Sequence, residues 1–206
     1  MEGAAGTLIH LGLVGLVSAW VVIAASVMVN QWFRLDANAF SDLGAQTARM
    51  PWIFNYGIMG VGVVICVYSW ALGVFASNRV ETSSATFFMV SGAFLVLIGY
   101  FHEGTYPHLF VSYWFFIQSA VAIIAWGTGS MLGGERRTGA LIAAMGILSA
   151  VAAAMVPWQS IGEAEAFGIA VIDIWTVAVA LQLRRRRDRT GLEKAGLTVS
   201  SFKLVK

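Results

Sequence analysis

The sequence predicts an all-α, polytopic membrane protein: a bundle of six transmembrane helices with both termini in the cytoplasm. Composition is the first observation, because 58% of the 206 residues are hydrophobic and only 12% are charged, whereas about a quarter of the residues in a soluble domain are charged. The second observation is that six long apolar runs fill most of the chain. The third is that all of the 13 Lys and Arg residues except Arg34 and Arg49 fall in segments on one side of these runs.

The six runs match the length of membrane-spanning helices, since about 17–25 apolar residues cross a hydrocarbon layer of ~30 Å. Only helices suit such runs, because lipid offers no hydrogen bonds to the backbone. The expected spans are residues 7–29, 52–76, 85–101, 108–132, 140–156 and 166–183. Together they form one domain over residues 1–183. The first run has no Lys or Arg before it and is too long for a signal peptide, so we expect it to remain as a span.

One connection differs from the others, which are short enough to make consecutive helices antiparallel neighbours. Residues 30–51 form a longer, polar segment that contains Asn38, Ser41 and Asp42. Long polar loops in compact bundles usually carry function. Within this segment, residues 41–50 are expected to form a short interfacial helix capped by Ser41 or Asp42.

The positive charge predicts the topology, because Lys and Arg stay on the cytoplasmic side during insertion. Residues 184–206 are therefore expected to be a basic cytoplasmic tail. Its first members form a cluster directly after the last span: Arg184, Arg185, Arg186 and Arg187. Such a cluster either anchors the topology or binds anionic lipid headgroups.

Acidic and histidine side chains gather on the opposite, outer side. Histidine beside carboxylates supports either a metal site with an open position for water or metal-free acid–base catalysis. The candidate catalytic residues are Asp42, Glu103, His108 and Glu165. The candidate headgroup-binding residues are Asn38, Ser41, His102, Ser112, Trp158 and Asp173, together with the four arginines of the tail. The spacing of the histidines matches no zinc signature, so the metal-bound and metal-free alternatives both stay open.

Other cofactors are limited by the residues available. Cys66 is the single cysteine, which excludes a disulfide within the chain and a cysteine-based iron–sulfur site. Haem is not expected either, because no two histidines lie at matched depth within the spans.

Asp173 is an acid inside the last span. It shares a helix face with Glu165 and lies ~12 Å below it. A carboxyl group within a span needs a partner. We therefore expect Asp173 either to form the floor of a polar cleft or to be held by Gln118, a serine or a tryptophan N–H.

Four short motifs occur in order along the chain. They are residues 38–44 (NAFSDLG), 53–57 (IFNYG), 101–104 (FHEG) followed by His108, Ser112, Phe115 and Phe116, and 162–165 (GEAE) leading to Trp175. In this order they resemble a prokaryotic integral membrane family called domain of unknown function 998 (DUF998). The resemblance covers about residues 7–183 and implies a six-helix fold in a prokaryotic cell membrane, but no activity. His102 departs from the family pattern, which has proline there. Glu103 and His108 are therefore stronger candidates than His102 for a role shared across the family.

These observations predict a membrane protein whose outer cleft binds, and in one version modifies, a polar lipid headgroup. A belt of Trp and Tyr on the outer side supports this hypothesis. The alternative is a non-catalytic accessory or scaffold subunit of a larger membrane complex. A small-solute transporter is less favoured, because the chain has no internal repeat or broken helix. The expected partners are membrane lipid and, for a scaffold, other membrane subunits; no nucleic acid is expected.

Overall fold

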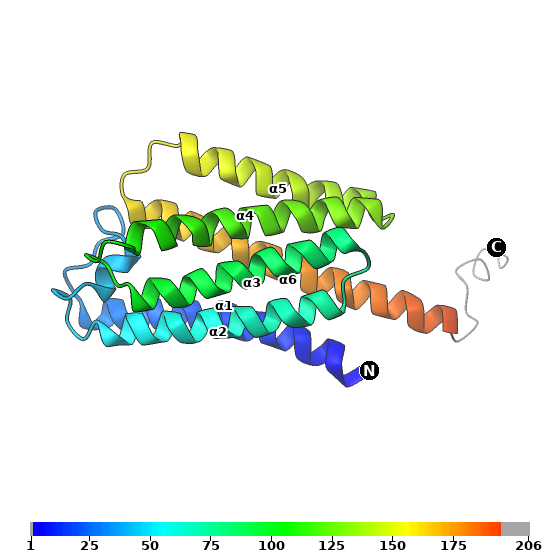
Figure 1. The fold of residues 1–206 in the computed structure, drawn as a ribbon, viewed down its shortest axis with the longest axis horizontal. Coiled ribbons are helices and arrows are strands. Elements are labelled where there is room, and N and C mark those ends of the chain that lie inside the picture. The colour runs from blue at the N-terminus through cyan, green and yellow to red at the C-terminus, as the bar shows by residue number, and fades with distance from the viewer. Residues whose placement is uncertain (1, 195–206) are drawn as a thin grey trace, which may run out of the picture.

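The computed structural model describes the backbone of residues 2–194 and the side chains of residues 11–189 (Figure 1). Its helices are α1 (Glu2–Val29), α2 (Trp52–Val74), α3 (Arg79–Tyr100), α4 (His108–Leu132), α5 (Arg136–Met155) and α6 (Ile161–Lys194), with a short 3-10 helix, η1 (Phe40–Gly44), between α1 and α2. All six α-helices contain a stretch long and apolar enough to cross a membrane. The chain is therefore a multi-pass membrane protein, and the predicted all-α, six-helix fold is confirmed.

Consecutive helices from α1 to α5 pack against one another, and α6 closes the bundle by contacting α1, α4 and α5 (Figure 1). Residues 30–51, 101–107 and 156–160 lie together at one end, which we call the loop end. Residues 75–78 and 133–135 lie at the other, which we call the basic end. Helix α1 begins and α6 ends on the side of the basic end.

Helices α3 and α5 begin earlier than their hydropathy predicts. Helix α3 begins at Arg79 rather than at residue 85. Asn78 caps it, because its Oδ1 accepts hydrogen bonds from the N–H groups of Val80 (3.0 Å) and Glu81 (3.1 Å). Helix α5 begins at Arg136 rather than at residue 140. In both cases the first turn is polar, so the apolar span found from hydropathy begins inside the helix rather than at its first residue.

The last helix is also longer than expected. It covers Ile161–Lys194 instead of residues 166–183. The backbone of residues 184–194, which were expected to begin a tail, therefore continues α6. The rest of that expected tail, residues 195–206, lies outside the described residues.

The short helix of the long connection is smaller than expected, since η1 covers Phe40–Gly44 rather than residues 41–50. It ends there because Ala45 has an extended backbone (φ −65°, ψ 153°). Position 44 requires glycine, as a Cβ would lie 2.1 Å from Oδ1 of Asn55. The Nδ2 of Asn55 donates to the Gly44 carbonyl (2.9 Å), so η1 is fixed against the start of α2.

Aromatic side chains fill the interior where α2, α3 and α6 meet. The ring of Phe88 packs edge-on against those of Trp175 and Tyr68, with centroids 4.7 and 6.3 Å apart. Helices α4 and α5 touch through their backbones, because a Cβ on Gly127 would lie 2.3 Å from the nitrogen of Ala143. Small residues give membrane helices this close packing.

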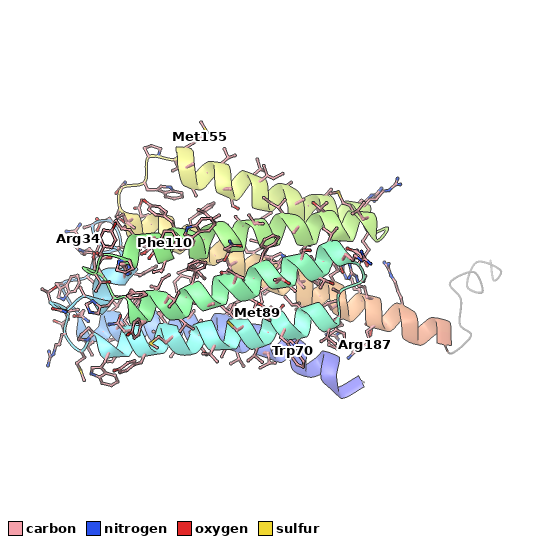
Figure 2. The ribbon with its side chains drawn as sticks, in the orientation of Figure 1. Arg34, Trp70, Met89, Phe110, Met155 and Arg187 are labelled. Atoms are coloured by element: carbon pink, nitrogen blue, oxygen red, sulfur yellow. The ribbon has the colours of Figure 1, made fainter. Side chains whose placement is uncertain are left out.

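The lateral surface is apolar (Figure 2). Trp70, Phe110 and Met155 are well exposed along it, whereas Arg34 and Arg187 lie at opposite ends. A bundle with lipid around its sides and water at its ends needs this distribution.

Candidate functional site

One buried side chain, Asn30, folds the connection between α1 and α2 back over the loop end. Its Nδ2 donates to the carbonyls of Ser26 (2.9 Å) and Arg49 (3.0 Å). Its Oδ1 accepts from the N–H of Arg49 (2.7 Å) and from Nε1 of Trp32 (3.0 Å), so the full capacity of the amide is used. Asn30 thereby joins the two ends of the connection and holds η1 on the bundle, with Leu43 fully buried.

A histidine and a carboxylate form the centre of the candidate site. His108 begins α4 and is 3% exposed; its Nε2 lies 2.9 Å from Oε2 of Glu103 and its Nδ1 lies 2.7 Å from the carbonyl oxygen of Phe101. A carbonyl only accepts hydrogen bonds, so Nδ1 carries a proton. The hydrogen bond between Nε2 and Oε2 then needs one further proton, which either the imidazole ring or the carboxyl group carries. Such a pair is suited to acid–base chemistry.

Two hydroxyl groups complete this centre. Ser41 Oγ donates to Oε2 of Glu103 (3.2 Å), and Ser112 Oγ lies 3.4 Å from Nε2 of His108, one turn along α4. The structure thus brings together four of the predicted residues from three segments: η1, the connection after α3, and α4.

Glu165 reaches the same place from α6. Its Oε2 accepts a hydrogen bond from the N–H of Phe40 (2.6 Å). It also lines a pocket with Ser41 and Ser112. Glu103 lies close enough to interact electrostatically with it. Within the described residues, no Lys or Arg side chain forms an ion pair with either carboxylate.

Asp42 has a local role at the edge of the site. Its Oδ2 accepts from the N–H of Ala39 (2.9 Å), which caps η1. Like Glu103, it interacts electrostatically with Glu165. Neither Ser41 nor Asp42 is the N-cap that the sequence suggested: the N-cap is Ala39, and Asp42 binds its N–H from the third position of the helix.

Three other predicted residues make contacts outside the pocket. Asn38 Oδ1 accepts from the N–H of Arg34 (2.9 Å) within a turn. His102 Nδ1 lies 2.9 Å from the carbonyl oxygen of Glu103. Trp158 Nε1 donates to a backbone carbonyl of α5 (3.2 Å). These residues shape the loop end around the site.

An apolar cavity adjoins the pocket. The residues that line both are Ile23, Ile58, Leu95, Phe115 and Ile169. From there the cavity continues between α1, α2 and α6 as far as Gly12, Tyr68 and Thr176. The loop end therefore has a pocket with Ser41, Ser112 and Glu165 in an otherwise apolar lining, next to a longer apolar cavity.

Asp173 borders the apolar cavity and not the pocket beside Glu165. Its Oδ2 accepts from Nε1 of Trp20 on α1 (2.8 Å). Among the partners that the sequence left open, the structure has the tryptophan N–H. Gln118 Oε1 is buried and has no hydrogen-bond partner among the described residues.

A family model described as a protein of unknown function (DUF998) matches residues 13–182. The chain belongs to the DUF998 family. The resemblance inferred from the four motifs is thereby confirmed. The match extends from α1 into α6 and includes the residues around Glu103 and His108. No curated protein and no solved structure matches the chain.

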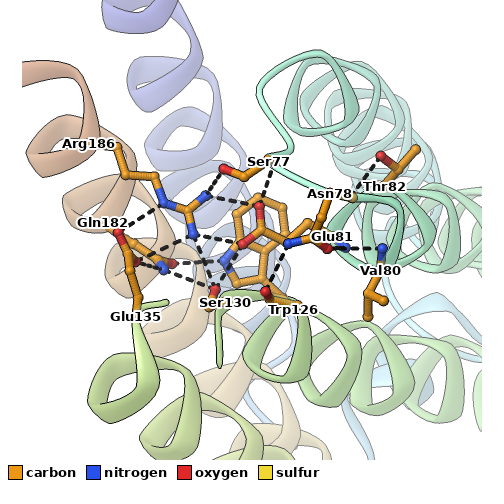
Figure 3. Close-up of polar contacts among 11 residues, drawn as sticks. Ser77, Asn78, Val80, Glu81, Thr82, Trp126, Ser130, Glu135, Gln182 and Arg186 are labelled. Carbon is orange, nitrogen blue, oxygen red and sulfur yellow. Dashed lines mark hydrogen bonds and ion pairs between the residues drawn. The ribbon is translucent and has the colours of Figure 1, made fainter. Parts of the chain in front are cut away.

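This DUF998 protein has a second polar cluster at the basic end, which the sequence did not reveal (Figure 3). Arg186 donates to both carboxylate oxygens of Glu81 (2.7 and 2.9 Å) and, from Nε, to Glu135 (3.2 Å). Glu81 is fully buried and also accepts from Ser130 Oγ (3.0 Å) and the N–H of Ser77 (2.8 Å). Arg186 was expected in a headgroup-binding tail; its side chain is instead bound inside the bundle and is 17% exposed.

Gln182 extends the basic-end cluster by one turn of α6. It accepts from Nε1 of the fully buried Trp126 (2.9 Å) and donates to Ser130 Oγ (2.9 Å) and to Glu135. Two sequence signals indicate this cluster in retrospect. Gln182 and Arg186 are four residues apart on one helix face, and Glu81 follows a capping asparagine. The other arginines of the predicted cluster, Arg184, Arg185 and Arg187, are exposed.

Over the part of the chain that the structure describes, no group of three or more His, Cys, Asp or Glu side chains could hold a metal ion. The loop end of the DUF998 protein offers instead one His–carboxylate pair with two hydroxyl groups beside it. What these residues can do themselves is donate hydrogen bonds and transfer protons.

Proposed function

We propose that this DUF998 protein binds a membrane lipid at the loop end of its bundle. The headgroup contacts Ser41, Glu103, His108, Ser112 and Glu165, and an acyl chain occupies the apolar cavity between α1, α2 and α6. The observation that carries the proposal is that a pocket bordered by the polar side chains of Ser41, Ser112 and Glu165 adjoins an apolar cavity through shared lining residues. An amphiphile is the class of ligand with matching polar and apolar parts.

The extent of the cavity supports an acyl chain. Helix α2 lines the pocket beside Glu165 at Phe54 and the inner end of the cavity at Tyr68. These positions are ~21 Å apart along the helix axis. A ligand of that length reaches from the loop end well into a ~30 Å hydrocarbon layer.

In the catalytic version of this proposal, the Glu103–His108 pair acts on the headgroup. A hydroxyl group or water bound beside Ser112 gives its proton to the pair and later receives one from it. Ser41 fixes Glu103 through their hydrogen bond. A positioned acid–base group of this kind contributes about 10²–10⁴-fold to a rate.

We also propose that the loop end faces the outside of a prokaryotic cell membrane. The arginines at the basic end support this orientation. In a Cys66→Ala background, a membrane-impermeant maleimide applied to intact cells should label Arg34→Cys and leave Arg187→Cys unlabelled until the cells are permeabilised. The reverse labelling pattern contradicts the orientation.

Lipid binding is tested by native mass spectrometry of the protein purified in mild detergent. The wild-type protein should retain one lipid class above its share of the membrane. Ile169→Trp should lose that lipid, because Ile169 lines both spaces and a larger side chain blocks their junction. Asp36→Asn is the control, since this exposed residue lies away from the pocket. Retention of the lipid by Ile169→Trp, or no enriched lipid in the wild type, contradicts the proposal.

Catalysis is tested separately, by product analysis in liposomes made from the enriched lipid. Glu103→Gln should keep the lipid and stop its conversion, because the amide cannot exchange the proton. If the wild type converts no lipid, the catalytic version is contradicted and only lipid binding remains. A scaffold predicts a different outcome, in which another membrane protein copurifies in fixed ratio and no lipid class is enriched.

A further inference from the structure

Tyr68, which lines the inner end of the apolar cavity, has a hydroxyl group that the protein buries. This side chain is 2% exposed, and its hydroxyl has no hydrogen-bond partner among the described residues. Tyr68 lines the cavity from α2. Buried tyrosine hydroxyls usually have a partner, because leaving one unpaired destabilises the fold.

Residues 11–189, whose side chains the structure describes, supply no partner for this hydroxyl at the inner end. A Cβ on Gly12 would lie 2.9 Å from Cε2 of Tyr68 and 3.0 Å from Cγ2 of Thr176, so three helices meet there. Thr176 Oγ1 donates to the carbonyl of Ile172 in its own helix (2.9 Å). Asp173, the other polar side chain of the cavity, accepts from Trp20 instead.

We infer that Tyr68 is a second polar binding residue, and that the cavity takes a chain with a hydroxyl or carbonyl oxygen near the end remote from the headgroup. The inference rests on the proposed lipid binding and specifies the ligand of that site. The headgroup pocket and Tyr68 are ~21 Å apart along α2. The ligand class is therefore a long-chain amphiphile that is polar at both ends.

Ser69 provides a matched control. Its Oγ is fully buried and, like that of Tyr68, has no partner among the described residues. It belongs to the same helix but lines neither the cavity nor the pocket. A ligand in the cavity should therefore respond to Tyr68→Phe and not to Ser69→Ala.

The experiment compares two probes that differ only at the chain end: hexadecanoyl glycerol and its ω-hydroxy derivative. Calorimetry with the full-length protein in detergent measures both affinities. The wild type should bind the hydroxylated probe roughly tenfold more tightly, because it pairs the buried phenol. Tyr68→Phe should abolish this preference. Ser69→Ala should keep the preference.

The outcomes separate this inference from the proposed function. Equal affinity of the wild type for the two probes overturns the role of Tyr68 while lipid binding stands. An equal loss of preference in Tyr68→Phe and Ser69→Ala also overturns it, since the effect is then not local to the cavity. If neither probe binds the wild type, both the inference and the proposed lipid binding are contradicted.

Discussion

The two ends of the bundle both place acidic side chains at helix junctions, and they differ in what pairs with them. At the basic end, Glu81 is fully buried and both of its oxygens are bound by Arg186. At the loop end, Glu103 is 33% exposed and contacts His108, and Glu165 receives a backbone N–H. A pocket borders Glu165.

This difference separates two reasons for placing charge in a membrane protein. Burying an ion pair removes its hydration, which costs free energy. The attraction between the two groups offsets this cost only when their hydrogen bonds are complete. The basic-end cluster meets that condition within the protein and fixes α6 against α3 and α4. The loop-end cluster is less saturated by protein partners, since Glu103 is 33% exposed. The structural cluster and the candidate site therefore differ in how fully protein partners fill the hydrogen-bonding capacity of their acidic groups. Their depth in the membrane distinguishes them less.

The largest effect is expected from Arg186→Met. This change leaves Glu81 buried without its cation, which typically costs about 3–5 kcal/mol. Thermal unfolding in detergent, followed by circular dichroism, should show a large fall in Tm or too little folded protein to measure. Arg185→Met is the control, because the neighbouring side chain is exposed. If both variants unfold alike, the buried pairing does not stabilise the basic end.

A smaller effect is expected from Asp173, which has one partner and borders the cavity. Asp173→Leu removes the acceptor of Trp20 Nε1, at a cost of about 1–3 kcal/mol. Asp173→Asn keeps an acceptor in the same position and should retain most of the stability. Melting curves of both variants in the same detergent provide the measurement. If Asp173→Asn destabilises the protein as much as Asp173→Leu, Asp173 is bound as a charged group. It would then resemble the paired carboxylates of the basic end.

The sequence predicted the fold because the membrane restricts it, since six apolar runs leave few alternatives to six helices. It predicted part of the loop-end site because His108 and Ser112 are one turn apart and Glu103 precedes them in the same connection. It could not predict the pairing of Glu81 with Arg186, because those residues come from helices far apart in the chain. The role of Asn30 was missed for the same reason, as its main partner Arg49 lies at the other end of a long connection.

A still smaller effect on stability is expected from Glu103→Gln. Glu103 accepts from Ser41 Oγ at Oε2 and from the N–H of Gly104 at Oε1, and the single amide oxygen of glutamine replaces only one of these acceptors. The free energy of unfolding should therefore change by only about 1 kcal/mol. Binding or conversion of lipid should change instead, as proposed above. Melting curves and lipid analysis on one preparation check both parts. A loss of stability as large as that of Arg186→Met would show that the loop end is a second structural cluster.

The smallest effect is expected at the exposed Arg34–Asp36 pair, which lies at the loop end but outside the pocket. Hydrogen bonds from Arg34 to Asp36 (2.7 and 3.1 Å) lower the pKa of Asp36. The pair therefore favours the folded protein at neutral pH, and this contribution is lost as the pH falls through the lowered pKa, below about pH 4. Water and salt screen it, because both side chains are exposed. Asp36→Asn should match the Tm of the wild type in melting curves at neutral and acid pH, with or without added salt. A fall in Tm comparable with that of Asp173→Leu would mean that surface charge, rather than the buried amide of Asn30, holds the long connection over the pocket.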